Sequence, residues 1–97
     1  MAVQNPLGPR PGGSLSALDL TTATVVKASP GTVYRVVVNT AGSTAGGIYD
    51  AATTAGNVAA NLVATIEAAG VYNLEFPCAT GILFEPGTGM VASVSYA

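Results

Sequence analysis

Charged residues are scarce in this chain of 97 residues. They make up 8% of the sequence, and there is no histidine and no tryptophan, whereas about 25% of an ordinary soluble domain is charged. A free monomer uses charges, lysine above all, to stay soluble and to protect the edges of its sheets. Apolar residues reach 49%, so we interpret much of the surface as buried against other subunits. The alternative is a soluble monomer coated with serine, threonine and asparagine.

The missing residue types exclude several classes of function. Without histidine, serine and threonine have no general base for a hydrolase triad. The five acids are spread along the chain, so we predict no catalytic carboxylate pair, no enzyme activity, no cofactor and no metal. The net charge of −2 argues against a nucleic-acid partner. Only Asp50, in an otherwise apolar or small-residue stretch, is unusually placed, which leaves a metal or hydrogen-bond role as an alternative.

Neither a membrane span nor a secretion signal is expected. The longest clean apolar run, residues 36–38, is far shorter than the ~20 residues of a spanning helix. Three prolines and three glycines fall within the first 20 residues, where a signal peptide has its apolar core. We therefore expect synthesis in a host cytoplasm. Cys78 has no second cysteine to pair with, and we interpret it as a small buried residue rather than a nucleophile or an intermolecular link.

Residues 1–20 differ in composition from the rest of the chain. The stretch NPLGPRPGGS, residues 5–14, holds three of the six prolines and three of the twelve glycines. Proline fixes φ and extends the residue before it, while Gly-Gly-Ser lets the chain pivot. We predict an extended N-terminal arm over residues 1–20. Its candidate partner-contact residues are Asn5, Pro6, Leu7, Pro9, Arg10 and Pro11.

Residues 21–97 show short β-branched runs separated by turn signals. This spacing predicts one all-β domain, a compact antiparallel sandwich or a barrel. We expect about seven strands, at residues 23–28, 32–39, 48–52, 62–67, 71–76, 82–85 and 90–96. The fourth and fifth are predicted to pair as a hairpin, with Tyr72, Leu74 and Phe76 facing the core. Glycine-rich residues 41–47 are expected to form a long hairpin loop, because a phosphate cradle would need a helix after it.

The stretch TVYRVVVN, residues 32–39, is apolar on both faces. Such a strand belongs in the middle of a sheet or at an interface. Arg35 interrupts it, and the sequence leaves two alternatives for this side chain. It pairs with Glu67 or Glu75 across the sheet, or it is an exposed arginine in water.

Two stretches, VVKASPGTVYRVVVNTAG (residues 25–42) and AAGVYNLEFPCATGILFEPGTG (residues 68–89), follow the arm in a chain without active-site residues. In these features the chain resembles the small decoration, or cement, proteins of tailed bacteriophage heads, over residues 23–97. The resemblance implies a jelly-roll-like β-sandwich that forms dimers or trimers outside the phage head, and we favour a homotrimer. It also implies that the major capsid protein is the partner and that the arm lies along neighbouring subunits.

We therefore expect a structural virion protein that decorates and stabilises a bacteriophage capsid, with no nucleic-acid or membrane partner. A first alternative is a tail, neck or fibre component, which the same composition allows. A second is a carbohydrate- or surface-binding β-module. That function would require exposed clusters of tryptophan or tyrosine, and the chain has no tryptophan and four scattered tyrosines.

Overall fold

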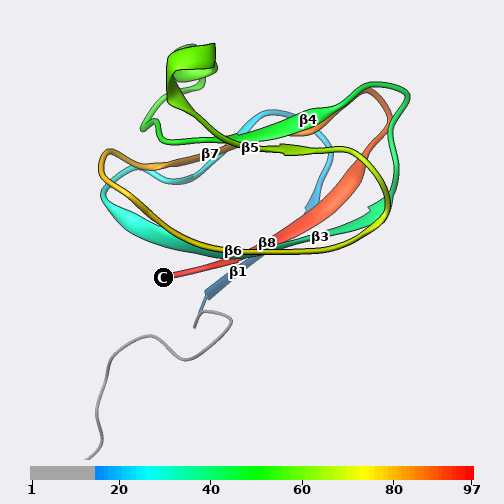
Figure 1. The fold of residues 1–97 in the computed structure, drawn as a ribbon, viewed down its shortest axis with the longest axis horizontal. Coiled ribbons are helices and arrows are strands. Elements are labelled where there is room, and N and C mark those ends of the chain that lie inside the picture. Colours follow the sequence, from blue (N-terminus) through cyan, green and yellow to red (C-terminus); the bar gives the residue numbers. More distant parts are fainter. Residues whose placement is uncertain (1–14) are drawn as a thin grey trace, which may run out of the picture.

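The computed structural model describes residues 15–97, and the predicted contact residues of the arm lie outside them. The described residues form two four-stranded antiparallel sheets (Figure 1), which confirms the all-β class. The expected number of about seven strands is wrong, because there are eight. The strand that was missed is β1 (Leu15–Leu20), which lies in the stretch assigned to the arm.

The first sheet has the spatial order β1–β8–β3–β6, with β1 and β6 at its edges. Its other members are β8 (Val91–Tyr96), β3 (Gly31–Thr40) and β6 (Gly70–Cys78). The strand expected to be central, β3, does lie between two neighbours, β8 and β6. Its run of valines fits this position, because β-branched side chains pack well on a pleated surface that is covered by neighbours.

The second sheet has the order β2–β7–β4–β5. It consists of β2 (Thr24–Lys27), β7 (Ile82–Glu85), β4 (Gly46–Tyr49) and β5 (Leu62–Ile66). Two 3-10 helices, η1 (Thr54–Gly56) and η2 (Ala59–Asn61), lie between β4 and β5 in the chain. Each of these helices has only three residues.

The chain is folded like one long antiparallel ribbon. β1 pairs with β8, β2 with β7, β3 with β6, and β4 with β5. The predicted hairpin of β5 with β6 is therefore wrong, because these strands belong to different sheets. Their connection crosses between the sheets, and the hydroxyl of Tyr72 braces it by accepting from the Glu67 N–H at 3.1 Å and donating to the Ala68 carbonyl at 2.9 Å. The glycine-rich connection from β3 to β4 also joins the two sheets and is not a hairpin loop.

A single hydrophobic core lies between the two sheets. Both sheets contribute fully buried residues to it, such as Val36 and Val94 from the first and Ile48, Ile66 and Phe84 from the second. Burying a side chain of this size stabilises a fold by about 1.5–3 kcal/mol. The shared core therefore accounts for the way the sheets are held together.

Both edge strands of the first sheet are irregular, and each irregularity carries an acid. The register of β1 shifts between Ala17 and Leu20, and Asp19 there has φ 56°. On β6 the register shifts before Phe76, where Glu75 has φ 49°. A bulge bends its strand. Phe76 is the register partner of the buried Val33 and so lies on the core side as expected, but on this edge strand it remains 42% exposed, whereas Tyr72 and Leu74 pack against the core.

Candidate functional site

The outer side of the first sheet is built mostly from short, uncharged side chains. Cross-strand partners lie on the same side of a sheet, so the register fixes two outward rows. One row is Ser16, Ser95, Arg35 and Asn73, and the other contains Ser93, Val37 and Val71. Leu18, 69% exposed, joins Val37 and the serines around a shallow depression of about 240 Å³. We call these eight residues the Ser/Val face.

Arg35 is the one charged side chain in these rows. Its Nε donates to Oδ1 of Asn73, its register partner on β6, at 2.8 Å. Of the two alternatives from the sequence, the structure shows the exposed arginine, and its partner is the neutral Asn73 in place of the Glu67 or Glu75 carboxylate. Beside it, the Oγ of Ser95 is buried without a hydrogen-bond partner. Covering this face would desolvate few charges, which keeps the energetic cost of association low.

The outer side of the second sheet is partly covered by the chain itself. Residues 50–61, which we call the covering segment, contain η1 and η2 and lie over one end of this side (Figure 1). Leu83 alternates along β7 with the core residues Ile82 and Phe84, so it points outward, yet it is fully buried. Ala51 is also buried outside the main core. The covering segment therefore gives this sheet a small second apolar contact.

Asp50 fastens the start of the covering segment. Its carboxylate accepts from the backbone N–H groups of Ala79, Thr80 and Gly81 at 2.9, 2.8 and 3.2 Å. Burial raises the pKa of Asp50, but these three donors outweigh it, so the net pKa lies below its usual value. Of the two roles that the sequence left open for Asp50, the structure shows the hydrogen-bond acceptor. Among residues 15–97 there is no group of three potential metal ligands.

Cys78 lies at the end of β6, just before the turn that Asp50 holds. It is buried, and burial together with the nearby Asp50 charge raises the pKa of its thiol to about 11. At neutral pH the thiolate, which is the reactive form, is then very rare. The geometry agrees with the packing role expected from the sequence.

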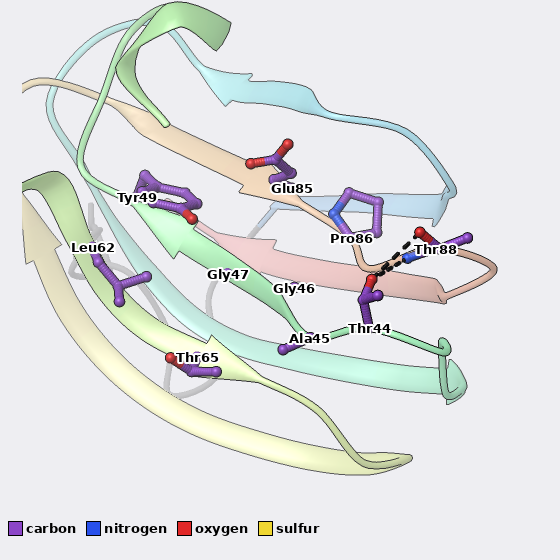
Figure 2. A pocket seen from close by; sticks show the side chains of 10 residues that line it. All are labelled: Thr44, Ala45, Gly46, Gly47, Tyr49, Leu62, Thr65, Glu85, Pro86 and Thr88. Atoms are coloured by element: carbon purple, nitrogen blue, oxygen red, sulfur yellow. Dashed lines mark hydrogen bonds between the residues drawn. The ribbon is translucent and has the colours of Figure 1, made fainter. Parts of the chain in front are cut away.

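An open groove lies beside the covering segment on the outer side of the second sheet (Figure 2). We call it the β4 groove; it has a volume of about 470 Å³. Its lining residues come from three parts of the chain and are Thr44, Ala45, Gly46, Gly47, Tyr49, Leu62, Thr65, Glu85, Pro86 and Thr88. The register places Gly47 opposite both Thr65 and Glu85, so a glycine forms the floor between two polar side chains.

Three contacts shape the β4 groove. A Cβ atom at Gly47 would lie 3.1 Å from both Leu62 Cδ1 and Tyr49 Cε1, so the glycine leaves these side chains as walls. Asn57 of the covering segment donates to Glu85 Oε1 at 3.0 Å and orients that carboxylate. At one end, the hydroxyl of Thr44 accepts from the Thr88 N–H at 2.8 Å. The groove thus combines one aromatic ring, one exposed leucine and one carboxylate.

Sequence reasoning did not identify the β4 groove, because its residues are spread from 44 to 88. One signal was present: a Gly-Gly pair inside a strand marks a place where a neighbouring group approaches closely. No helix among residues 15–97 is long and apolar enough to cross a membrane. In comparisons with known proteins, no family model, curated protein or solved structure matches this chain.

Proposed function

We propose that the two sheets form a jelly-roll sandwich. The argument is the strand order: a jelly roll is an eight-stranded, two-sheet fold in which a folded antiparallel ribbon pairs the first strand with the last and so on inward. The observed pairs are β1·β8, β2·β7, β3·β6 and β4·β5. Because this fold occurs in capsid proteins, lectins and enzymes alike, the function has to be argued from a surface and not from the fold.

The function that the surface supports best is decoration and stabilisation of a bacteriophage capsid on the outside of the head. The Ser/Val face carries this proposal. Its two rows hold one charged residue, Arg35, and leave Val71 59% exposed and Leu18 69% exposed. Apolar side chains with few charges are what the centre of a stable interface requires. The major capsid protein is the proposed partner of this face.

The edge strands of the first sheet favour binding through the Ser/Val face and not through an edge. Asp19 and Glu75 put a negative charge and a left-handed residue on each edge strand. Charges and bulges at an edge prevent another strand from pairing there. A partner therefore meets this sheet on its outer side, and copies of the chain associate, as a homotrimer in this proposal, without extending the sheet.

Location within particles tests the proposal and separates it from the tail alternative. Particles of the phage that encodes the chain are separated into heads and tails, and each fraction is analysed by mass spectrometry and by antibody labelling of intact particles. We expect the chain in the head fraction, accessible from outside. Labelling confined to tails would replace the decoration role with that of a tail component.

Light scattering on the purified chain is the second test. A homotrimer is expected at micromolar concentration. A monomer that also fails to bind heads prepared without it would contradict the proposed function.

A further inference from the structure

We propose that the β4 groove binds the proline-rich residues 5–11 of a neighbouring copy of this chain. This inference rests on the proposed function, in which the N-terminal segment contacts neighbouring subunits, and it names where one such contact is made. The argument comes from the groove, from the sequence of the segment and from their charges.

The groove has the features of a site for an extended proline-rich chain. Tyr49 and Leu62 form apolar walls on either side of the Gly47 floor, and Leu62 is 43% exposed. Pro86 and the threonines close its end. Grooves lined by aromatic side chains recognise polyproline segments, because such segments lose little conformational freedom on binding and carry few N–H groups that need partners.

Residues 5–11 read NPLGPRP, which contains the spacing Pro6-x-x-Pro9. A polyproline helix has three residues per turn, so Pro6 and Pro9 would lie on one side of the segment. Leu7 and Arg10 share the same spacing and would lie on a second side. One side can then contact Tyr49 and Leu62 while the other presents the guanidinium of Arg10.

The charges of the groove and of residues 5–11 are complementary. Glu85 is the one charged residue that lines the groove, and Arg10 is the one charged residue of the stretch 5–14. Asn57 donates to Oε1 of Glu85. The other oxygen, Oε2, can then accept from a guanidinium. Another arginine of the chain, Arg35, lies on the Ser/Val face of the opposite sheet, where it donates to Asn73.

The length of the connection favours a neighbouring copy. The four residues from Pro11 to Leu15 span at most about 14 Å. Leu15 begins β1 at the edge of the first sheet, whereas the groove lies on the outer side of the second. Packed sheets are about 10 Å apart, so a path around the molecule to its own groove uses the whole reach of the connection. Binding to a neighbour avoids this cost and links two copies.

Disulfide trapping between full-length variants tests the inference. A Gly8→Cys chain is mixed with a Thr65→Cys chain and oxidised gently. Thr65 lines the groove and is exposed, while the native Cys78 is buried and reacts slowly. We expect the mixed dimer to form at least ten times faster than with a Ser93→Cys chain, which carries its thiol on the Ser/Val face. Equal rates with the two partners would overturn the proposal.

A binding measurement gives an independent readout. A labelled peptide of residues 1–14 is titrated with the full chain and followed by fluorescence anisotropy. Glu85→Gln in the chain, or Arg10→Gln in the peptide, is expected to weaken binding about fivefold or more, and Gly47→Ala, which narrows the floor, to weaken it further. Peptide binding unaffected by all three changes would contradict the groove as the site, and so would a disulfide in a Gly8→Cys/Thr65→Cys chain that forms only within one copy.

The outcome is separable from that of the proposed function. If disulfide trapping fails while a Gly47→Ala chain still occupies phage heads, only the proposed groove contact is contradicted. If trapping succeeds but the chain is absent from phage heads, the contact between copies stands and the capsid role is contradicted.

Discussion

The outer sides of the two sheets differ in how far the chain itself covers them. On the second sheet, the covering segment lies over one end of the strands, and the outward-pointing Leu83 is fully buried. On the first sheet, the equivalent central position, Val37 of β3, remains partly exposed between serines and Val71. The covered side thus adds to the stability of the chain, whereas no segment of residues 15–97 covers the Ser/Val face, which we propose as the surface that contacts a partner.

The largest effect on stability is expected from removing a buried side chain on the covered sheet. Leu83→Ala removes a fully buried side chain and should lower the free energy of unfolding by about 2–4 kcal/mol. Val37→Ala, on the outer side of the first sheet, should cost less than about 1 kcal/mol, because its side chain is already partly hydrated. Urea unfolding of both variants measures the difference. Equal losses would mean that Leu83 is not buried as described.

An intermediate effect is expected at Asp50, which fastens the covering segment. Asp50→Asn removes the charge and one of the two acceptor oxygens that serve three backbone donors. We expect a loss of about 1–2 kcal/mol in the free energy of unfolding. Glu67→Gln, an exposed acid elsewhere in the chain, is the matched control and should change stability by less than 0.5 kcal/mol in magnitude, about the usual range for surface substitutions.

The pH dependence of stability has a definite sign at the same residue. The pKa of Asp50 is lower in the folded chain than its ordinary value of 3.8. Its contribution is therefore fully present above the ordinary pKa and is lost as the pH falls through the lowered one. Thermal unfolding between pH 2 and pH 6 should show a shallower acid decline for Asp50→Asn than for the native chain. Parallel curves for the two chains would count against the hydrogen-bonded carboxylate.

The smallest effect concerns the edge of the first sheet. Glu75 has φ 49°, a conformation that costs a non-glycine residue about 1 kcal/mol or more. Glu75→Gly should therefore be neutral or stabilising by about 0.5 kcal/mol, whereas Glu67→Gly should destabilise by about 0.5–1 kcal/mol. Thermal melts of the two variants provide the comparison. A clear destabilisation at position 75 would contradict the left-handed bulge.

The sequence was sufficient for the fold class because the alternation of apolar residues and the turn signals are local. It failed where backbone irregularities break the alternation. The bulge at Asp19 interrupts the pattern of Leu15–Leu20, so β1 was read as part of the arm. A second bulge lies at Glu75, and beside it Phe76 is only partly buried on the edge strand. Neither bulge is marked by glycine, the residue that usually signals a left-handed position.

The candidate surfaces were predictable only in part. The scarcity of charge predicts a surface that is buried against other subunits, which stays a prediction, whereas Asp50 was recognised as unusually placed. The donors to Asp50 lie 29–31 residues away in sequence, and the β4 groove joins residues from three segments. Both sites depend on which connections cross between the two sheets. The sequence predicted β5 and β6 as one hairpin instead. Without the strand order, these residues could not be brought together.

Rebinding to phage heads made without the chain tests the central claim most directly. The native chain is compared with Val37→Asp, which puts a charge in the middle of the Ser/Val face, and with Thr54→Asp, which puts the same charge on the exposed covering segment of the other sheet, outside the β4 groove. The account predicts native occupancy for Thr54→Asp and a loss of about tenfold or more in affinity for Val37→Asp, while both variants remain folded. Full occupancy by Val37→Asp would contradict the assignment of the Ser/Val face as the attachment surface.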